Sequence, residues 1–293
     1  MTANTTELRD HFQREGFAIA RRLFSLEETT AYRDHYMRLS EEGLHPNDLV
    51  NQLDDGEHEP LKRYTRLFNM LRWDEISQQW LLHERLRRCL TAISGREPYA
   101  IQTMAYFKPP GARGQALHQD QYYLRAQPGT SIAAWMALEE IDAANGCLQV
   151  VPGTHSIPLI CPVEADEAES FTNIVVPLPD GMAPVPIPLS PGDFLFFNGQ
   201  IVHGSFPNTT IDRFRRTLVG HYIEGHARQV SGFDHPVLRM DGTAATEVGV
   251  SPNGGECELT LNPAFEHGLL VMEGELELDG ERFAENELAA LDP

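Results

Sequence analysis

The order of apolar and polar positions begins with a helical pattern interrupted by one short alternating stretch. Residues 6–14 have helical periodicity, and GFAIARRLF over 16–24 alternates as a strand does. Ser25 and Glu28 have the spacing of a capping box, in which each residue satisfies a backbone N–H of the other. This spacing predicts that a helix begins here and continues over SLEETTAYRDHYMRL, residues 25–39.

The pattern then changes from helical to β-rich. Residues 44–61 are polar and contain Pro and Gly, which predicts a surface loop, and a helical pattern returns over 74–94. From Pro98 the chain consists of short apolar runs separated by turns: YAIQTMAYFKPP, SIAAWMALEEI, GCLQVVPGTH, PVPIPLSPGDFLFFN and RTLVGHYIEG. Regularly spaced runs predict a β-sandwich or barrel. The simplest assembly is mainly β, a jelly-roll-like, cupin-like double-stranded β-helix with helices packed outside.

The pattern weakens beyond about residue 230 and resumes in HGLLVMEGELELDGERF, residues 267–283. This segment predicts a β-hairpin with Asp279 and Gly280 as its turn. It either adds an edge to the sheet or resembles part of a second cupin-type repeat. It has no His or Asp spacing suited to another metal site, so we expect a structural role.

The predicted organisation is therefore one main domain over residues 1–258 and a C-terminal β-hairpin extension over 259–293. Within the main domain, residues 1–97 are the helical part and 98–228 the β-helix core.

Composition narrows the classes of partner. With 293 residues, 41% of them hydrophobic, the chain can bury a large core. The formal net charge is −20 and the pI near 4.9, so the field of the protein repels nucleic acid and anionic membranes and favours cationic ligands. We expect neither nucleic acid nor membrane as a partner. The polar start and the absence of any run of 18 apolar residues predict a cytoplasmic location.

Cysteine spacing excludes two common classes. The four cysteines form no CxxC pair, which argues against zinc-ribbon and thioredoxin-type sites. We expect them to be buried or idle free thiols: Cys89, Cys147, Cys161 and Cys257.

Candidate chemistry lies in LHQDQYYL, residues 117–124, and FFNGQIVHGSFPN, residues 196–208. His118 and Asp120 are two positions apart in a predicted strand, so their side chains share one face. His203 is too distant for local pairing but normally placed for strands that meet in a closed β fold. Two histidines and one carboxylate, with other positions open, form the ligand set of non-haem Fe(II) oxygenases. The competing interpretation is that both histidines are structural and are satisfied by backbone hydrogen bonds.

A basic cluster follows in DRFRRTLVGHY, residues 212–222. Arg215 shares one strand face with Thr217 and Val219, whereas Arg216 lies on the other, so we expect one inward arginine. A buried arginine near a hydroxyl such as that of Ser205 is suited to hold a carboxylate with two hydrogen bonds. A dicarboxylate cosubstrate needs such an anchor at its far end.

Three blocks in order, HQD, AWMALEEIDAANGCLQVVPGTH and HGSFPNTTIDRFRR, together resemble the phytanoyl-CoA dioxygenase family of Fe(II)- and 2-oxoglutarate-dependent oxygenases. The resemblance runs from about residue 10 to about 258. It implies a double-stranded β-helix dioxygenase domain with these iron ligands: His118, Asp120 and His203. It further implies these contacts to 2-oxoglutarate: Arg215 with Ser205 at the distal carboxylate, and Met104 and Trp135 along the pocket, beside which we place Gln102.

The likeness leaves alternatives for the anchor. The gap from Asn208 to Arg215 is one residue longer than in the mammalian member, so Arg213 or Arg216 are alternatives, of which strand parity disfavours Arg216. Arg66, in the helical part, matches a basic cosubstrate contact of the family.

The reaction expected from the resemblance is hydroxylation of a small molecule with dioxygen, releasing succinate and CO2. Desaturation, epoxidation and ring closure use the same iron machinery. Related halogenases have a small residue in place of the carboxylate ligand, so Asp120 argues against halogenation. The alternatives are a cupin-like metal-binding or sensor protein without turnover, and a zinc or iron cupin hydrolase or isomerase in which Arg215 is dispensable.

Substrate information is limited to the surroundings of the metal motif. Five residues either line a polar pocket with aromatic walls or simply pack in strands: Gln102, Tyr106, Gln121, Tyr122 and Tyr123. HQDQYYLRAQPGT also resembles bacterial members that tailor small molecules, including the kanamycin dioxygenase type. With the acidic charge, this favours a polar or cationic substrate over an acyl-CoA, whose phosphates would be repelled. The oligomeric state does not follow from the sequence.

Overall fold

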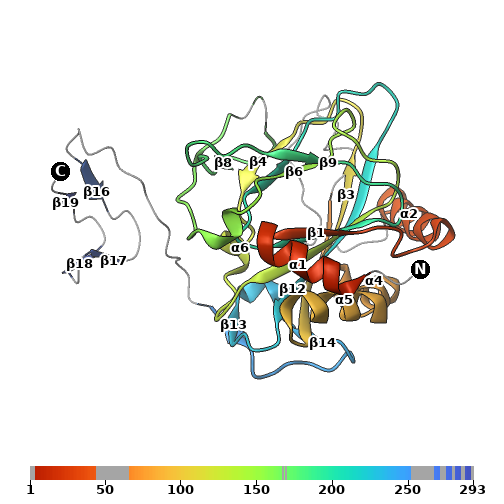
Figure 1. Ribbon diagram of the computed structural model, residues 1–293, viewed down its shortest axis with the longest axis horizontal. Coiled ribbons are helices and arrows are strands. Elements are labelled where there is room, and N and C mark those ends of the chain that lie inside the picture. Colours follow the sequence, from red (N-terminus) through yellow and green to blue (C-terminus); the bar gives the residue numbers. More distant parts are fainter. Residues whose placement is uncertain are drawn as a thin grey trace.

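The computed structural model describes residues 4–43, 66–166, 168 and 170–251, together with the backbone of four short strands beyond them. In the main body, helices cover one face of a large antiparallel sheet, and a smaller sheet packs on the other face (Figure 1). The predicted jelly-roll, cupin-like class with flanking helices is confirmed.

The helices follow the predicted pattern closely. They are α1 (Thr5–Glu15), α2 (Leu26–Glu41), α4 (Glu75–Leu81), α5 (Glu84–Ser94) and the single turn α6 (Gln121–Leu124). Short 3₁₀ segments are η2 (Met70–Arg72), η3 (Thr154–Ser156) and η4 (Gly232–Asp234). The capping box is present, since Ser25 and Glu28 each accept a hydrogen bond from the backbone N–H of the other. Because residues 44–65 lie outside the described part, the predicted loop over 44–61 stays a prediction.

The major sheet contains, among the described residues, seven strands in the order β1-β10-β5-β12-β3-β14, with β2 also paired to β3. Their bounds are β1 (Phe17–Ala20), β2 (Leu67–Phe68), β3 (Pro98–Lys108), β5 (Ser131–Ala137), β10 (Phe194–Asn198), β12 (Arg215–Glu224) and β14 (Leu238–Arg239). The first strand is shorter than GFAIARRLF predicts. It ends at Ala20 because the chain turns at Arg22, which has a positive φ of 50°.

The minor sheet has the order β4-β11-β6-β9. Its strands are β4 (Gln115–His118), β6 (Leu148–Val150), β9 (Val185–Ile187) and β11 (His203–Ser205). Outside the main sheets and before the C-terminal strands, β7 (Val163–Glu164) pairs with β8 (Ile174–Val175), and β13 (Gln229–Val230) pairs with β15 (Gly249–Val250).

Two apolar cores hold these layers together. Between the sheets, Trp135 and Leu195 of the major sheet pack with Leu148 and Ile187 of the minor sheet. Side chains alternate between the two faces of each strand. Those on the outer face of the major sheet pack against the helices, as Phe194 does against Trp80. The inner core therefore lies on the side of the major sheet that faces β4 and β11.

The C-terminal strands are β16 (His267–Leu270), β17 (Glu275–Leu278), β18 (Glu281–Ala284) and β19 (Leu288–Leu291). β17 pairs antiparallel with β18, with Leu278 opposite Glu281, as the predicted hairpin requires. Asp279 and Gly280, its predicted turn, lie outside the described residues. Among the described residues, these strands pair only with one another and not with the major or minor sheet.

The cysteine expectation is partly wrong. Cys89 and Cys147 are buried free thiols, whereas Cys161 is disulfide-bonded. Sequence spacing does not reveal such a bond, because the cysteines involved approach each other only through the folded chain. In the part of the chain that the structure describes, no helix has both the length and the apolar character needed to cross a membrane.

The helix-to-sheet layer gives a stability prediction. Phe194 is fully buried and stacks on Trp80 at a centroid distance of 6.2 Å. Phe194→Ala leaves a cavity and should lower the free energy of unfolding by about 3–5 kcal/mol in urea denaturation. The control Leu26→Ala, at a side chain that is 67% exposed, should change it by less than about 0.5 kcal/mol. Equal effects of the two substitutions would contradict the described packing.

Candidate active site

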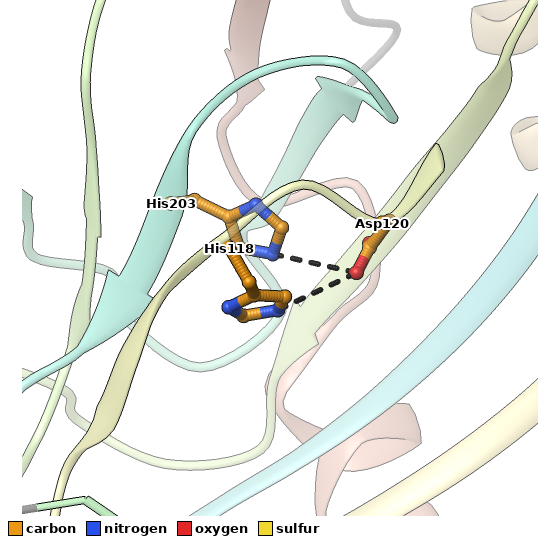
Figure 2. Close-up of side chains that lie close together, drawn as sticks. All are labelled: His118, Asp120 and His203. Atoms are coloured by element: carbon orange, nitrogen blue, oxygen red, sulfur yellow. Dashed lines mark ion pairs between the residues drawn. The ribbon is translucent and has the colours of Figure 1, made fainter. Parts of the chain in front are cut away.

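His118, Asp120 and His203 converge, with ligand atoms that all lie within 4.8 Å of one another (Figure 2). His118 ends β4 and His203 begins β11, and the two are direct partners in the antiparallel register. Asp120 is not in the strand, contrary to the prediction. The strand ends at His118, and Asp120 adopts helical φ and ψ at the start of α6. The turn, rather than strand parity, brings its carboxylate back toward the histidines.

The backbone sets the tautomer of both histidines. Nδ1 of His118 donates to the carbonyl of Ala116 at 2.9 Å, and Nδ1 of His203 donates to the carbonyl of Ile201 at 3.1 Å. Each Nε2 therefore carries a lone pair, and these two atoms lie 3.5 and 3.7 Å from Oδ1 of Asp120. Such a second hydrogen bond on Nδ1 is the usual support of a metal-bound histidine.

The protonation states of His203 and Asp120 favour binding of a cation between them. Burial lowers the pKa of His203 to about 4, assisted by the neighbouring His118, so this imidazole is neutral at pH 7. Burial also acts to raise the pKa of Asp120, but His203, His118 and His221 together hold it well below its usual range. An ionised carboxylate beside a neutral imidazole is the donor set that a divalent iron ion requires, and the residues present fit it.

Two buried cations lie at one end of the inner face of the major sheet. Arg215 of β12 is opposite Lys108 of β3 in the register, and both are only 2% exposed. Nζ of Lys108 donates to Oγ of Ser205 at 2.8 Å. Arg215 donates to the carbonyl of Gly146 at 3.1 Å and to Oγ1 of Thr217 at 3.2 Å.

Neither cation has an ion pair with a carboxylate among the described residues. Burial, with the adjacent Arg215, lowers the pKa of Lys108 well below its ordinary value, and burial lowers that of Arg215 to about 10. Because an unpaired buried charge is costly, this pair is a site prepared for an anion.

Comparison with known proteins agrees with this geometry. The sequence profile of the phytanoyl-CoA dioxygenase (PhyH) family matches residues 12–217, more than half of the chain. The chain belongs to the phytanoyl-CoA dioxygenase family. The predicted resemblance, enzyme class and cofactor pair are thereby confirmed.

Among the relatives of this family, the peroxisomal phytanoyl-CoA dioxygenase of Bos taurus is 27% identical over 237 residues, covering 76% of this chain and 70% of the bovine protein. The Mus musculus enzyme is 28% identical over 231 residues, covering 74% and 68%.

Solved structures show the same fold. The epimerase SnoN, in a complex with Fe3+, alpha ketoglutarate and nogalamycin RO, superposes with a TM-score of 0.62 at 19% identity, covering 76% of this chain and 85% of SnoN. AviO1 from Streptomyces viridochromogenes superposes with a TM-score of 0.58 at 26% identity, covering 78% and 98%.

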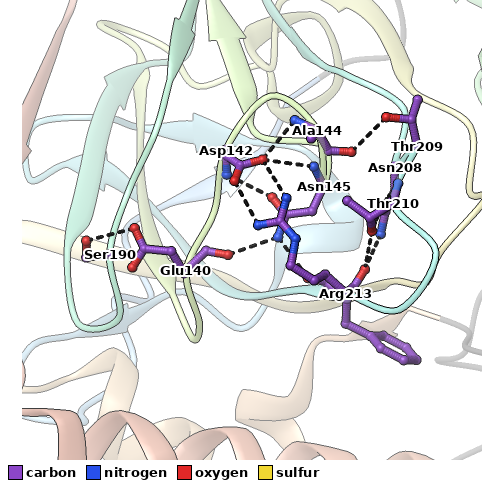
Figure 3. Close-up of polar contacts among 10 residues, drawn as sticks. Glu140, Asp142, Ala144, Asn145, Ser190, Asn208, Thr209, Thr210 and Arg213 are labelled. Carbon is purple, nitrogen blue, oxygen red and sulfur yellow. Dashed lines mark hydrogen bonds and ion pairs between the residues drawn. The ribbon is translucent and has the colours of Figure 1, made fainter.

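The neighbouring arginines of this family member have other partners. Arg213 forms an ion pair with Asp142 at 2.7 Å, and Arg216 forms one with Glu139 at 3.5 Å. Figure 3 shows Arg213 within a network that ties residues 140–145 to 208–210, in which Asp142 and Asn145 hydrogen-bond each other. Arg213 thus supports the loop that carries Gly146. Arg215 is the inward arginine, as strand parity predicts.

The remaining predicted cosubstrate residues fall into two places. Trp135 and Tyr106 flank the Arg215 guanidinium, with ring centroids 5.6 and 5.8 Å from it, and Met104 packs in the same inner core. Gln102 lies elsewhere. It is six positions from Lys108, about 20 Å along the strand, and donates to Oδ1 of Asp234 at 2.7 Å.

Two tyrosines lie near His118. The ring centroid of Tyr123 is 6.3 Å from that of His118 and 5.2 Å from that of Tyr122, and both tyrosines are more than 40% exposed. Arg66 contacts three aromatic faces, those of Phe68, Tyr106 and Phe171. Gln121 is structural, since its side chain donates to the carbonyl of Ala126 and accepts from the backbone N–H of Ser131.

A cavity of about 880 Å³ opens beside the site. Its lining includes Gln115, whose amide donates to Nε2 of His118 at 3.1 Å, and Ser205, which contacts Lys108. Two residues of the cavity lining thus contact His118 and Lys108.

Sequence reasoning missed two residues of this site, Lys108 and His221. Nε2 of His221 lies 3.2 Å from Oδ2 of Asp120. Strand parity could have found His221, which has the same parity as Arg215 on β12. Lys108 gave no local signal, because its place depends on the register between β3 and β12.

The buried cation pair gives a second prediction. Lys108→Met removes an unpaired buried charge, so the apo-protein should melt at a higher temperature. In the same variant, 2-oxoglutarate should bind at least about tenfold more weakly, because a charge-assisted hydrogen bond is lost. Because the pKa of Lys108 is lowered on folding, the stability gain should shrink as pH rises toward about 10.4, where the unfolded lysine also loses its proton.

Calorimetry of both forms from pH 6 to 10 and 2-oxoglutarate titrations check this prediction. Arg9→Met, at an exposed position, is the control and should change neither property. An unchanged 2-oxoglutarate affinity in Lys108→Met would remove Lys108 from the site.

Proposed function

We propose that the protein hydroxylates a small molecule, with His118, Asp120 and His203 as Fe(II) ligands and Arg215, Lys108 and Ser205 as the anchor of 2-oxoglutarate. One observation carries this proposal. The ligand trio and two buried cations, which have no carboxylate partner among the described residues, lie in the interior of the same β-helix. A site that binds only a metal needs the ligand trio alone. A site that also binds a dicarboxylate cosubstrate needs both the ligand trio and the buried cations.

The residues of the chain bind and orient the iron, the cosubstrate and the substrate, and they exclude water from the site. Bound iron and 2-oxoglutarate supply the oxidising chemistry, with consumption of dioxygen and release of succinate and CO2. His118 and His203 present neutral Nε2 atoms, and Asp120 supplies the negative charge. Arg215 and Lys108, which have no carboxylate partner among the described residues, gain one from 2-oxoglutarate.

Asp120 also bears on the type of reaction. Its carboxylate fills the position at which related halogenases have a small residue, so oxidation of a C–H bond is proposed rather than halogen transfer. Desaturation and ring closure differ from hydroxylation only in how the substrate is placed.

The alternative without 2-oxoglutarate turnover is disfavoured by the cations. A cupin-like metal-binding or sensor protein, or a cupin hydrolase, has no use for two buried unpaired positive charges, which destabilise the fold. Their retention is explained by an anion that they bind.

For the substrate, we propose a polar or cationic small molecule. The net charge of −20 attracts cations, and exposed aromatic rings such as Tyr122 and Tyr123 offer faces on which a cation can rest. The family includes relatives named for phytanoyl-CoA, but the acidic charge of this chain opposes a phosphate-rich substrate.

Domain limits and location remain predictions. We propose that residues 1–258 form the oxygenase domain and 259–293 an extension. We propose a cytoplasmic location, whereas the bovine relative is named as peroxisomal.

An anaerobic titration with Fe(II) and then 2-oxoglutarate tests the function. A weak visible metal-to-ligand charge-transfer band should appear in the parent protein. It should disappear in Asp120→Ala, which loses a ligand, and require at least about tenfold more 2-oxoglutarate in Arg215→Ala, which loses a charged hydrogen-bond donor.

Arg87→Ala is the control, because this arginine lies on α5, away from the site, and pairs with Glu84 and Glu97. It should behave as the parent does. Bound iron without any band on addition of 2-oxoglutarate would favour the metal-binding cupin alternative.

Substrate charge is tested by oxygen uptake with a panel of amino sugars and aminocyclitols and their N-acetylated forms. The free amines should stimulate uptake more than the acetylated compounds, and raising the ionic strength should reduce the difference because salt screens the attraction. Equal stimulation by both forms would refute a cationic substrate while leaving the oxygenase activity established.

A further inference from the structure

The two oxygens of the Asp120 carboxylate have different surroundings. Oδ1 faces Nε2 of His118 and of His203 at 3.5 and 3.7 Å. Oδ2 faces Nε2 of a third histidine, His221, at 3.2 Å. Asp120 makes no side-chain capping bond to α6, so local structure does not determine the rotation of its carboxylate.

His221 is held firmly in β12. It lies opposite Ala133 of β5 and Gln102 of β3, and the register with β3 shifts immediately after it. Such irregularities redirect side chains near active sites.

The residues on both sides of His221 are also fixed. The hydroxyl of Tyr222 donates to the carbonyl of Leu81 at 2.7 Å. A Cβ on Gly220 would lie 2.7 Å from Leu81, so the strand packs too closely against this region to shift.

Asp120 is the polar contact that orients the His221 ring. Nε2 of His221 donates to Oδ2 of Asp120 at 3.2 Å, since a carboxylate oxygen can only accept here. Nδ1 of His221 is buried and, in the described part of the chain, has no hydrogen-bond partner. The residue opposite in the register, Gln102, donates its amide to Asp234 instead.

We propose that His221 is a positioning residue for the metal site. By holding Oδ2, it keeps Oδ1 directed toward Nε2 of both His118 and His203, where Asp120 would contribute that oxygen to a metal. The backbone carbonyls of Ala116 and Ile201 orient the histidine ligands, and His221 performs the same task for the carboxylate ligand. This inference rests on the proposed iron site.

The experiment compares His221→Met with His221→Gln, which have similar volume but differ in whether the side chain can donate an N–H. Fe(II) affinity is measured anaerobically against a competing chelator, and the charge-transfer band is recorded with 2-oxoglutarate. His221→Met should bind Fe(II) about 10–100-fold more weakly, which is the usual effect of losing an outer hydrogen bond to a ligand. His221→Gln should recover most of this loss.

A matched control is His226→Met, because His226 also contacts a carboxylate, that of Glu224 at 3.2 Å, and lies just beyond the same strand. It should leave Fe(II) affinity unchanged. Thermal unfolding of each apo-protein separates a change at the metal site from a change in the fold. If His221→Met does not fold, His221→Phe, nearer in shape to the imidazole, takes its place.

The outcomes for this inference and for the proposed function are distinct. A parent protein that gives no band with Fe(II) and 2-oxoglutarate contradicts the proposed function. A parent that gives the band, together with a folded His221→Met variant of equal Fe(II) affinity, overturns the positioning role alone. A folded His221→Gln variant as weak as His221→Met also overturns it, because the donated hydrogen bond would then not be the cause.

Discussion

The site depends on the antiparallel register of β4 and β11, which sets His118 directly opposite His203. A slip of one residue in this register would turn one of the two imidazoles to the other face of the minor sheet. The neighbouring pairing of β11 with β6 places His203 opposite Val150, whose side chain belongs to the inner core, so apolar burial and metal geometry require the same alignment. The core therefore stabilises the arrangement that the chemistry needs.

Buried polar groups are arranged along the inner face of the major sheet. Arg215 and Lys108 occupy one end, and His221 and Gln102 occupy the other, on the same two strands. Between them, Met104 and Val219 are also paired in the register, which keeps apolar side chains between the two polar ends. A cosubstrate can thus be held at one end of β12 while the carboxylate ligand is oriented from the other.

The helical layer contributes rigidity rather than chemistry. Its residues cover the outer face of the major sheet, and the hydroxyl of Tyr222 reaches the carbonyl that ends α4. Because Tyr222 follows His221 directly, the packing of the helices also fixes the strand that carries the histidine. The outer face of β12 packs against the helices, and its inner face carries the residues of the site.

Local sequence patterns predict most of the helices and strands and the chemical types of the site residues. The capping box at Ser25, the β-rich pattern after Pro98, the HxD spacing of His118 and Asp120, and the inward parity of Arg215 all depend on residues close together along the chain. The folded chain shows what these patterns do not: Asp120 leaves the strand, and Lys108 lies beside Arg215. In the same way, Gln102 donates to Asp234 and His221 contacts Asp120. These contacts join segments that are far apart in sequence. Strand register decides which residues of those segments meet, and local residue types do not encode that register.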